Sequence, residues 1–147
     1  MILAHSLVGL LPLDHGGFSW FWLLGSVFPD IDHLFVLLRH RIFSFEKAVE
    51  RMRFEEKYGL RFKTPYVHSI LGAVVVSAAA SAISTHGAVY FFAAYCVHLL
   101  LDWPDRDEKE YFWPLKRKVK GFLPIGSRAE MIITAVLAFG VFAVYYW

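Results

Sequence analysis

Residues Phe18–Leu38 read FSWFWLLGSVFPDIDHLFVLL. A helix rises about 1.5 Å per residue, so this apolar stretch is long enough to cross the roughly 30 Å hydrocarbon core of a bilayer. Pro29, Asp30 and Asp32 interrupt it. Pro29 either kinks the helix or ends one segment and takes the first turn of the next. The stretch therefore predicts a membrane helix that carries carboxylates towards its C-terminal half.

The whole chain has the composition of an integral membrane protein. It has 147 residues, enough for a single domain over residues 1–147, of which 57% are hydrophobic and 18% aromatic. A soluble protein this small would struggle to bury so much apolar surface, whereas a bilayer removes the difficulty. The single Cys96 excludes a disulfide framework within the chain. The N-terminus lacks the basic segment and cleavage site of a secretory signal, so we expect it to be retained.

The remaining apolar stretches predict an all-α helical membrane bundle of about four to five membrane-embedded helices. Besides Phe18–Leu38 they are Ile2–Leu13, which is too short to span fully, and Tyr66–Ser84, Ala88–Trp103 and Glu130–Trp147. We expect Pro12 and the turn residues Asp14–Gly17 to close the first, and Thr85–Gly87 to join the hairpin.

Two polar segments lie between these apolar stretches. Ser44–Leu60 alternates acidic and basic residues and predicts an amphipathic helix outside the bilayer that stops near Gly59. Pro104–Arg128 predicts a loop with a short helix.

Charge placement gives the direction of each helix. Every Lys and Arg lies in one of two windows, Arg39–Lys63 and Arg106–Arg128. These windows flank a helical hairpin, so they lie on one side of the membrane, and the positive-inside rule makes that side cytoplasmic. A nucleic-acid binder would instead distribute its basic residues among its elements, so no nucleic-acid partner is expected. Phe18–Leu38 and Ala88–Trp103 then run inward, and Tyr66–Ser84 and the last helix run outward.

With these directions, four histidines and three aspartates fall at similar depth near the cytoplasmic leaflet. They are His5, Asp30, Asp32, His33, His68, His98 and Asp102. His98 and Asp102 are four residues apart and share a helix face. Imidazole and carboxylate groups are ligands for zinc, and also for manganese or iron. Ionisable groups in apolar helices are costly, which favours a functional site.

Simpler roles exist for each of these residues. A single His near a membrane interface is usually a hydrogen-bonded packing residue, and Asp102 could cap its helix or pair with Arg106. Asp32 points away from Asp30 and could support the site indirectly. Ser6 and Ser69 could act as nucleophiles, but helix packing is the favoured role because no Ser-His-Asp arrangement is evident. The convergence of the seven nevertheless favours a divalent-metal site.

Several segments together resemble a known family. They are the early His5, the PDIDH motif of Pro29–His33, the Thr64-Pro-Tyr-Val-His-Ser69 segment and the HLLLD motif of His98–Asp102. Their order resembles the LexA-regulated inner-membrane family of predicted metal-dependent hydrolases, with Trp113-Pro114 matching that family's Trp-Pro. The chain departs from the family before His68 and after Asp102, which affects substrate details more than metal binding. The HxxxD element is also distantly similar to zinc-dependent phospholipase C and P1-type nucleases.

The resemblance implies a multi-pass inner-membrane hydrolase that acts at the cytoplasmic face on a phosphoester or a phospholipid head group. The implied metal ligands are His5, Asp30, His33, His68, His98 and Asp102, with zinc as the first candidate ion. Asp32 would be a general base or a carboxylate that supports the ligands.

Two other functions stay open. The chain could be a metal-binding membrane module without catalysis, which a fully ligated ion would favour. A small transporter is the third reading, but the outer halves of the helices carry almost no polar residues, and a conducting path needs them on both sides. The sequence leaves the oligomeric state open.

Overall fold

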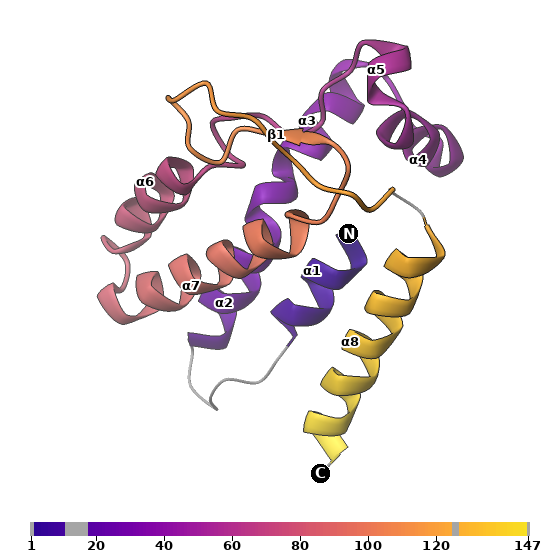
Figure 1. Cartoon of the computed structure of the whole chain (residues 1–147). Helices are drawn as coiled ribbons and strands as arrows, with labels where there is room; N and C mark the ends of the chain where they lie inside the picture. Colours follow the sequence, from indigo (N-terminus) through magenta and orange to yellow (C-terminus); the bar gives the residue numbers. More distant parts are fainter. Residues whose placement is uncertain (1, 11–17, 125–126, 147) are drawn as a thin grey trace.

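The computed structural model describes residues 2–10, 18–124 and 127–146, which form a mostly helical protein (Figure 1). Its helices are α1 (Ile2–Gly9), α2 (Phe18–Val27), α3 (Ile31–Arg39), α4 (Phe45–Arg53), α5 (Glu55–Tyr58), α6 (Ile70–Ala80), α7 (Thr85–Asp102) and α8 (Arg128–Tyr146). In Figure 1, α2 and α7 run towards the end of the molecule that carries α4, α5 and β1, whereas α6 and α8 run away from it. Both basic windows therefore lie at one end, and these four helices have the predicted directions relative to one another. Their orientation across the membrane stays a prediction.

The Phe18–Leu38 stretch is divided at Pro29. A 3-10 turn, η1 (Phe28–Asp30), separates α2 from α3, with Pro29 in its first positions. Proline is suited to the start of a helix because its missing N–H would have no partner there. The backbone stays in the right-handed helical region from Val27 to Ile31, so this turn is compatible with both predicted roles for Pro29. Among the described residues, Trp20–Arg39 is the one helical stretch long and apolar enough to cross a membrane, by its length and composition.

Small residues allow α2 and α7 to pack closely. A Cβ atom built on Gly25 would lie 2.3 Å from the carbonyl oxygen of Phe91, and one on Gly87 would lie 2.5 Å from the ring of Phe21. Neither distance is tolerable, so each glycine is needed for the approach of the two helices. This contact positions the end of α2, and therefore Ser26 and η1, against the part of α7 that carries His98.

The hairpin of α6 and α7 has different boundaries from those predicted. Ser69 caps α6 by accepting a hydrogen bond from the Gly72 N–H, and Ser84 caps α7 by accepting one from the Gly87 N–H, each over 3.0 Å. His68 therefore lies in the turn before α6 and does not begin the helix. Thr85–Gly87, predicted as the connecting turn, is the first turn of α7. Serine at these positions satisfies a free N–H group of the first turn, and this fixes where each helix begins.

The predicted Ser44–Leu60 helix is two helices. The chain leaves helical geometry at Phe54, where φ is −126° and ψ is 45°, and this break separates α4 from α5. The predicted stop at Gly59 is confirmed, because Gly59 ends α5 in the left-handed conformation with φ 60°. Ala48 of α4 packs in a small core with Val36 and Phe62, which fixes α4 against α3.

The segment after α7 forms a β-hairpin where a short helix was predicted. In the described part of this segment, β1 (Glu108–Lys109) pairs antiparallel with β2 (Val119–Lys120). Tyr111 anchors the hairpin: its hydroxyl donates to the Leu99 carbonyl over 2.9 Å, and its own carbonyl accepts from the Ile70 N–H over 2.9 Å. The loop is thereby held across the ends of α6 and α7. The predicted Pro12 and Asp14–Gly17 turn lies outside the described residues.

Candidate metal centre

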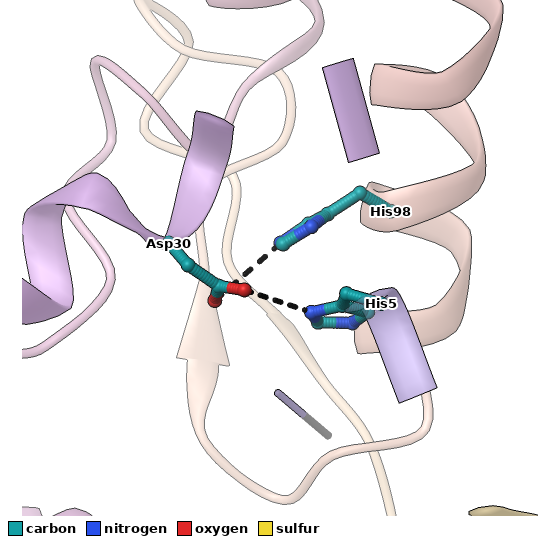
Figure 2. A group of neighbouring side chains, drawn as sticks. All are labelled: His5, Asp30 and His98. Atoms are coloured by element: carbon teal, nitrogen blue, oxygen red, sulfur yellow. Dashed lines mark hydrogen bonds and ion pairs between the residues drawn. The ribbon is translucent and has the colours of Figure 1, made fainter. Parts of the chain in front are cut away.

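The structure brings the seven predicted residues together at one end of the helices. His5 comes from α1, Asp30 from η1, Asp32 and His33 from α3, His68 from the turn before α6, and His98 and Asp102 from α7. Asp30 is partly exposed and the other six are buried. Three overlapping groups have ligand atoms within 4.8 Å of one another, namely His5–Asp30–His98, Asp30–His33–His68 and His68–His98–Asp102. Figure 2 shows the first of these groups.

Asp102 lies among three imidazole rings. Its Oδ1 is 3.3 Å from the Nε2 atom of His5. Its Oδ2 is 3.4 Å from Nε2 of His68 and 3.6 Å from Nε2 of His98. The side chain is 1% exposed, so water does not solvate this carboxylate. Three ring nitrogens thus face one buried carboxylate.

The opposite nitrogen of each ring is held by a hydrogen-bond acceptor. His98 Nδ1 donates to the Ser26 carbonyl over 2.7 Å, and His68 Nδ1 donates to Asp32 Oδ2 over 2.9 Å. His5 Nδ1 lies 3.3 Å from Asp30 Oδ2, which can only accept when ionised. In a neutral imidazole that donates through Nδ1, Nε2 carries the lone pair. Each ring is therefore oriented as histidines that bind metals are in proteins.

With the rings in this orientation, the lone pairs of the Nε2 atoms face the carboxylate oxygens of Asp102. The Nε2 atoms of His5, His68 and His98 and the Oδ1 atom of Asp102 are buried and have no hydrogen-bond partner among the described residues, whereas Asp102 Oδ2 has the Lys63 ammonium at 2.9 Å. A buried acceptor without a partner costs about 1–3 kcal/mol. A cation between these four atoms would satisfy all of them, and three imidazole nitrogens with a carboxylate are a usual donor set for a divalent metal. The donor atoms present therefore fit a metal ion.

Asp32 supports the rings and does not face this inner set. Its Oδ2 accepts from the backbone N–H of Thr64 over 2.7 Å, from the Thr64 hydroxyl over 3.1 Å and from His68. Its Oδ1 accepts from His33 Nδ1 over 3.0 Å. All of its acceptor groups are therefore engaged, which is the arrangement of a carboxylate that positions ligands.

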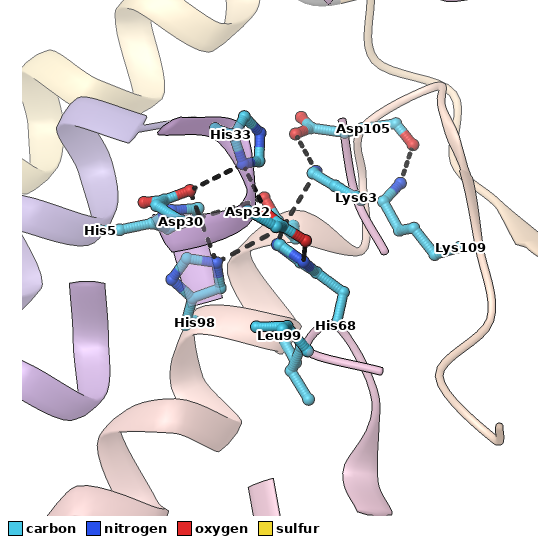
Figure 3. Close-up of polar contacts among 12 residues, drawn as sticks. His5, Asp30, Asp32, His33, Lys63, His68, His98, Leu99, Asp105 and Lys109 are labelled. Carbon is cyan, nitrogen blue, oxygen red and sulfur yellow. Dashed lines mark hydrogen bonds and ion pairs between the residues drawn. The ribbon is translucent and has the colours of Figure 1, made fainter. Parts of the chain in front are cut away.

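Lys63 is a buried residue of the site that the sequence did not reveal. Its ammonium lies 2.9 Å from Asp102 Oδ2 and 3.2 Å from a carboxylate oxygen of both Asp105 and Asp107. Figure 3 shows Lys63 beside Asp105. Burial alone would lower the pKa of Lys63, but the three carboxylates outweigh it and raise the pKa above its ordinary value. Lys63 is therefore charged. The sequence offers only a weak indication of this role, since Lys63 lies five positions before His68 among the many other cations of the Arg39–Lys63 window.

A second buried lysine extends the network into the hairpin. Lys109 lies 3.1 Å from Asp107 and also donates to the backbone carbonyl of Asp105. The carboxylates of Asp30, Asp32, Asp102, Asp105 and Asp107 outnumber the two ammonium groups by three when the imidazoles are neutral. Uncompensated buried charge is strongly unfavourable. With neutral imidazoles, this negative excess also favours a bound cation.

The family comparison matches residues 2–147, nearly the whole chain, to the YdjM inner membrane protein family. The chain belongs to the YdjM inner membrane protein family. Its predicted location in the inner membrane is thereby confirmed, and the match is consistent with the resemblance to the LexA-regulated inner-membrane family. No curated protein and no solved structure matches the chain.

In this YdjM-family protein the centre is accessible from one side. A cavity of about 510 Å³ is lined by His5, Asp30, His33, Lys63 and Asp102, and it continues between α4 and α8. A small molecule in this cavity would meet the partly exposed Asp30, whereas His5 and Asp102 are each 1% exposed. The simpler roles differ in detail from those predicted: Asp102 pairs with Lys63, where Arg106 was expected, and Ser69 caps α6, where helix packing was expected.

Proposed function

We propose that this YdjM-family protein is a membrane-bound metal-dependent hydrolase that cleaves a phosphoester, such as a phospholipid head group, at the cytoplasmic face of the inner membrane. One observation carries the proposal: four buried acceptor atoms, Nε2 of His5, His68 and His98 and Oδ1 of Asp102, converge without a hydrogen-bond donor among the described residues. The positive-inside distribution supports the cytoplasmic face and a multi-pass topology.

The structure divides the six predicted ligands by their contacts. His5, His68, His98 and Asp102 would form the inner set. Asp30 lies beside His5 Nδ1 and lines the cavity, so it would hold that ring and could complete the coordination. His33 lies 3.7 Å from Asp30 and hydrogen-bonds Asp32, so it belongs to the outer part of the site.

A bound divalent ion would supply an acidic water and would polarise the scissile bond. The protein's own residues have separate tasks. Asp32 holds His68 in place and acts as the supporting carboxylate. Lys63 neutralises part of the charge of Asp102 and, because it lines the cavity, presents a cation to an anionic substrate.

The number of inner ligands links the identity of the metal to the function. Four protein ligands complete a tetrahedral zinc site, which is the usual form of a structural site. A six-coordinate ion such as manganese or iron would keep positions for water and substrate. Manganese or iron therefore suits the hydrolase, whereas zinc bound by all four residues would favour a metal-binding membrane module without catalysis. The open cavity beside the site supports the hydrolase.

The test is hydrolysis by detergent-purified, metal-loaded protein of a panel of phospholipids and water-soluble phosphoesters. The comparison is with His98→Ala and with His86→Ala, which removes an exposed histidine from the same helix. We expect turnover by the wild type and by His86→Ala that is lost in His98→Ala. Metal-loaded protein that hydrolyses nothing in the panel would instead identify the non-catalytic module.

A further inference from the structure

The cavity at the metal centre has an apolar extension that metal binding does not use. Its polar lining includes His5, Asp30, His33, Lys63 and Asp102 of the site, and also four further carboxylates, those of Glu55, Asp105, Asp107 and Glu130. Its other end is lined by two helices, through Phe45, Val49 and Met52 of α4 and Met131, Thr134, Ala135 and Ala138 of α8. A pocket with a few polar groups at one end and apolar walls beyond them fits a ligand that is itself polar at one end only.

The apolar walls are also open to the bilayer. Phe45 is 85% exposed and Met131 is 60% exposed, although each lines the groove. Phe43, just before α4, is 78% exposed. In an inner-membrane protein, large apolar side chains at this level contact lipid, as they do in amphipathic helices at a membrane surface. The mouth between α4 and α8 therefore faces lipid acyl chains.

The charge at the polar end determines which head group fits. Carboxylates exceed cations there, and Lys63 is the buried cation that lines the cavity among the described residues. An anionic phosphate would be repelled by the carboxylates alone and attracted once a divalent ion is bound beside Lys63. A zwitterionic or anionic phospholipid would then match both ends of the cavity.

We propose that the groove between α4 and α8 binds an acyl chain of a membrane phospholipid, which enters sideways from the bilayer so that its phosphate reaches the metal centre. The position of the phosphate rests on the proposed function. The acyl-chain site does not, because binding in the groove requires no turnover.

The experiment is photolabelling of the full-length protein in vesicles of phosphatidylethanolamine with a minority of phosphatidylglycerol. The probe is a phosphatidylethanolamine with a diazirine in the middle of one acyl chain, and the labelled residues are located by mass spectrometry. We expect labels on Met52 and Thr134, which line the groove and are only partly exposed. Phe139, which is 74% exposed on α8 and does not line the groove, reports contact with bulk lipid.

Two variants on adjacent residues separate the groove from bulk lipid. Ala135→Trp places a large ring in the groove, whereas Val136→Trp places the same ring at a position that is 65% exposed and does not line it. We expect Ala135→Trp to lower the labelling of Met52 and Thr134 about tenfold, because a filled site no longer accepts a chain. Val136→Trp should leave it unchanged. Ala138→Phe, a smaller obstruction in the same groove, serves where Ala135→Trp impairs folding.

Unchanged labelling of Met52 and Thr134 in folded Ala135→Trp and Ala138→Phe overturns the acyl-chain site. If these variants instead abolish a dimer of the wild type and leave lipid labelling unaltered, the groove is a contact between two copies of the chain, and the proposal is also wrong. Metal content is measured on the same samples. Groove-specific labelling in protein that holds no metal would refute the metal centre while leaving the acyl-chain site intact.

Discussion

A metal centre and a network of buried ion pairs predict different effects of the isosteric Asp102→Asn substitution. The carboxylate lies within 3.6 Å of three Nε2 atoms and 2.9 Å from the Lys63 ammonium. Asparagine keeps the shape of the side chain, removes its charge and adds an N–H donor. We expect this change to reduce the stability of the protein only when metal is present.

The magnitudes follow from the contacts. Metal at about 100 times its dissociation constant stabilises the wild type by about 2.7 kcal/mol. Loss of one charged ligand should weaken binding about 100-fold, which removes nearly all of that stabilisation. Without metal, the new amide can donate to one imidazole nitrogen for about 1 kcal/mol, and this offsets the weaker attraction to Lys63, which keeps Asp105 and Asp107 as partners. The chelated proteins should therefore agree within about 1 kcal/mol.

Thermal unfolding in detergent, with the metal and with a chelator, measures these differences. Chelation should lower the unfolding temperature of the wild type by about 5–10 °C and change that of Asp102→Asn very little. If the three rings are instead protonated and paired with Asp102, the substitution breaks a buried ion-pair network and costs about 3–5 kcal/mol under both conditions. Equal destabilisation with metal and with chelator would therefore refute the metal centre.

Three further predictions concern the scaffold around the site. Gly25→Ala places a Cβ 2.3 Å from the Phe91 carbonyl oxygen and should destabilise the protein by about 1–3 kcal/mol, as measured by thermal unfolding. The control Gly140→Ala, whose Cβ meets no atom within 4 Å, should not destabilise it. Lys63→Met leaves three buried carboxylates without their shared cation and should cost about 3–5 kcal/mol by the same measurement; a cost below about 1 kcal/mol would mean that Lys63 does not hold them. Burial raises the pKa of Glu55 from 4.5 to about 7, so the folded protein holds a proton that the unfolded chain releases between these values. The stability that this proton provides is complete below pH 4.5 and is lost as the pH rises through 7, so unfolding curves measured across this window should show a steeper loss for the wild type than for Glu55→Gln.

The sequence was sufficient to predict which residues form the candidate site, because the depth of each residue follows from the direction of the helix that carries it. Positions of Lys and Arg predicted the direction of each helix without reference to the histidines and aspartates, and the helices have those directions relative to one another. His98 and Asp102 share a face by spacing alone, and His5 is brought beside them by the packing of α1. Residues from distant helices meet in this way when the helices have the right directions, and the positions of Lys and Arg predict those directions well.

The parts that the sequence did not predict depend on local hydrogen bonds and on loops. Apolar content placed His68 inside a helix, but the Ser69 cap starts that helix two residues later. Lys63 and Asp105 lie in polar segments without periodicity, and they meet only because Tyr111 holds the hairpin onto α6 and α7. No pattern in the sequence distinguishes these two charges from the solvated ones around them.

Metal content tests the central claim most directly. Detergent-purified wild type, the double variant His98→Ala/Asp102→Ala and the control His86→Ala are measured by elemental analysis. The wild type and His86→Ala should each contain about one or more divalent ions per chain, and the double variant should have lost most of its metal. Less than about 0.2 ion per chain in the wild type as well as in the double variant, after purification without chelators, would contradict the metal centre.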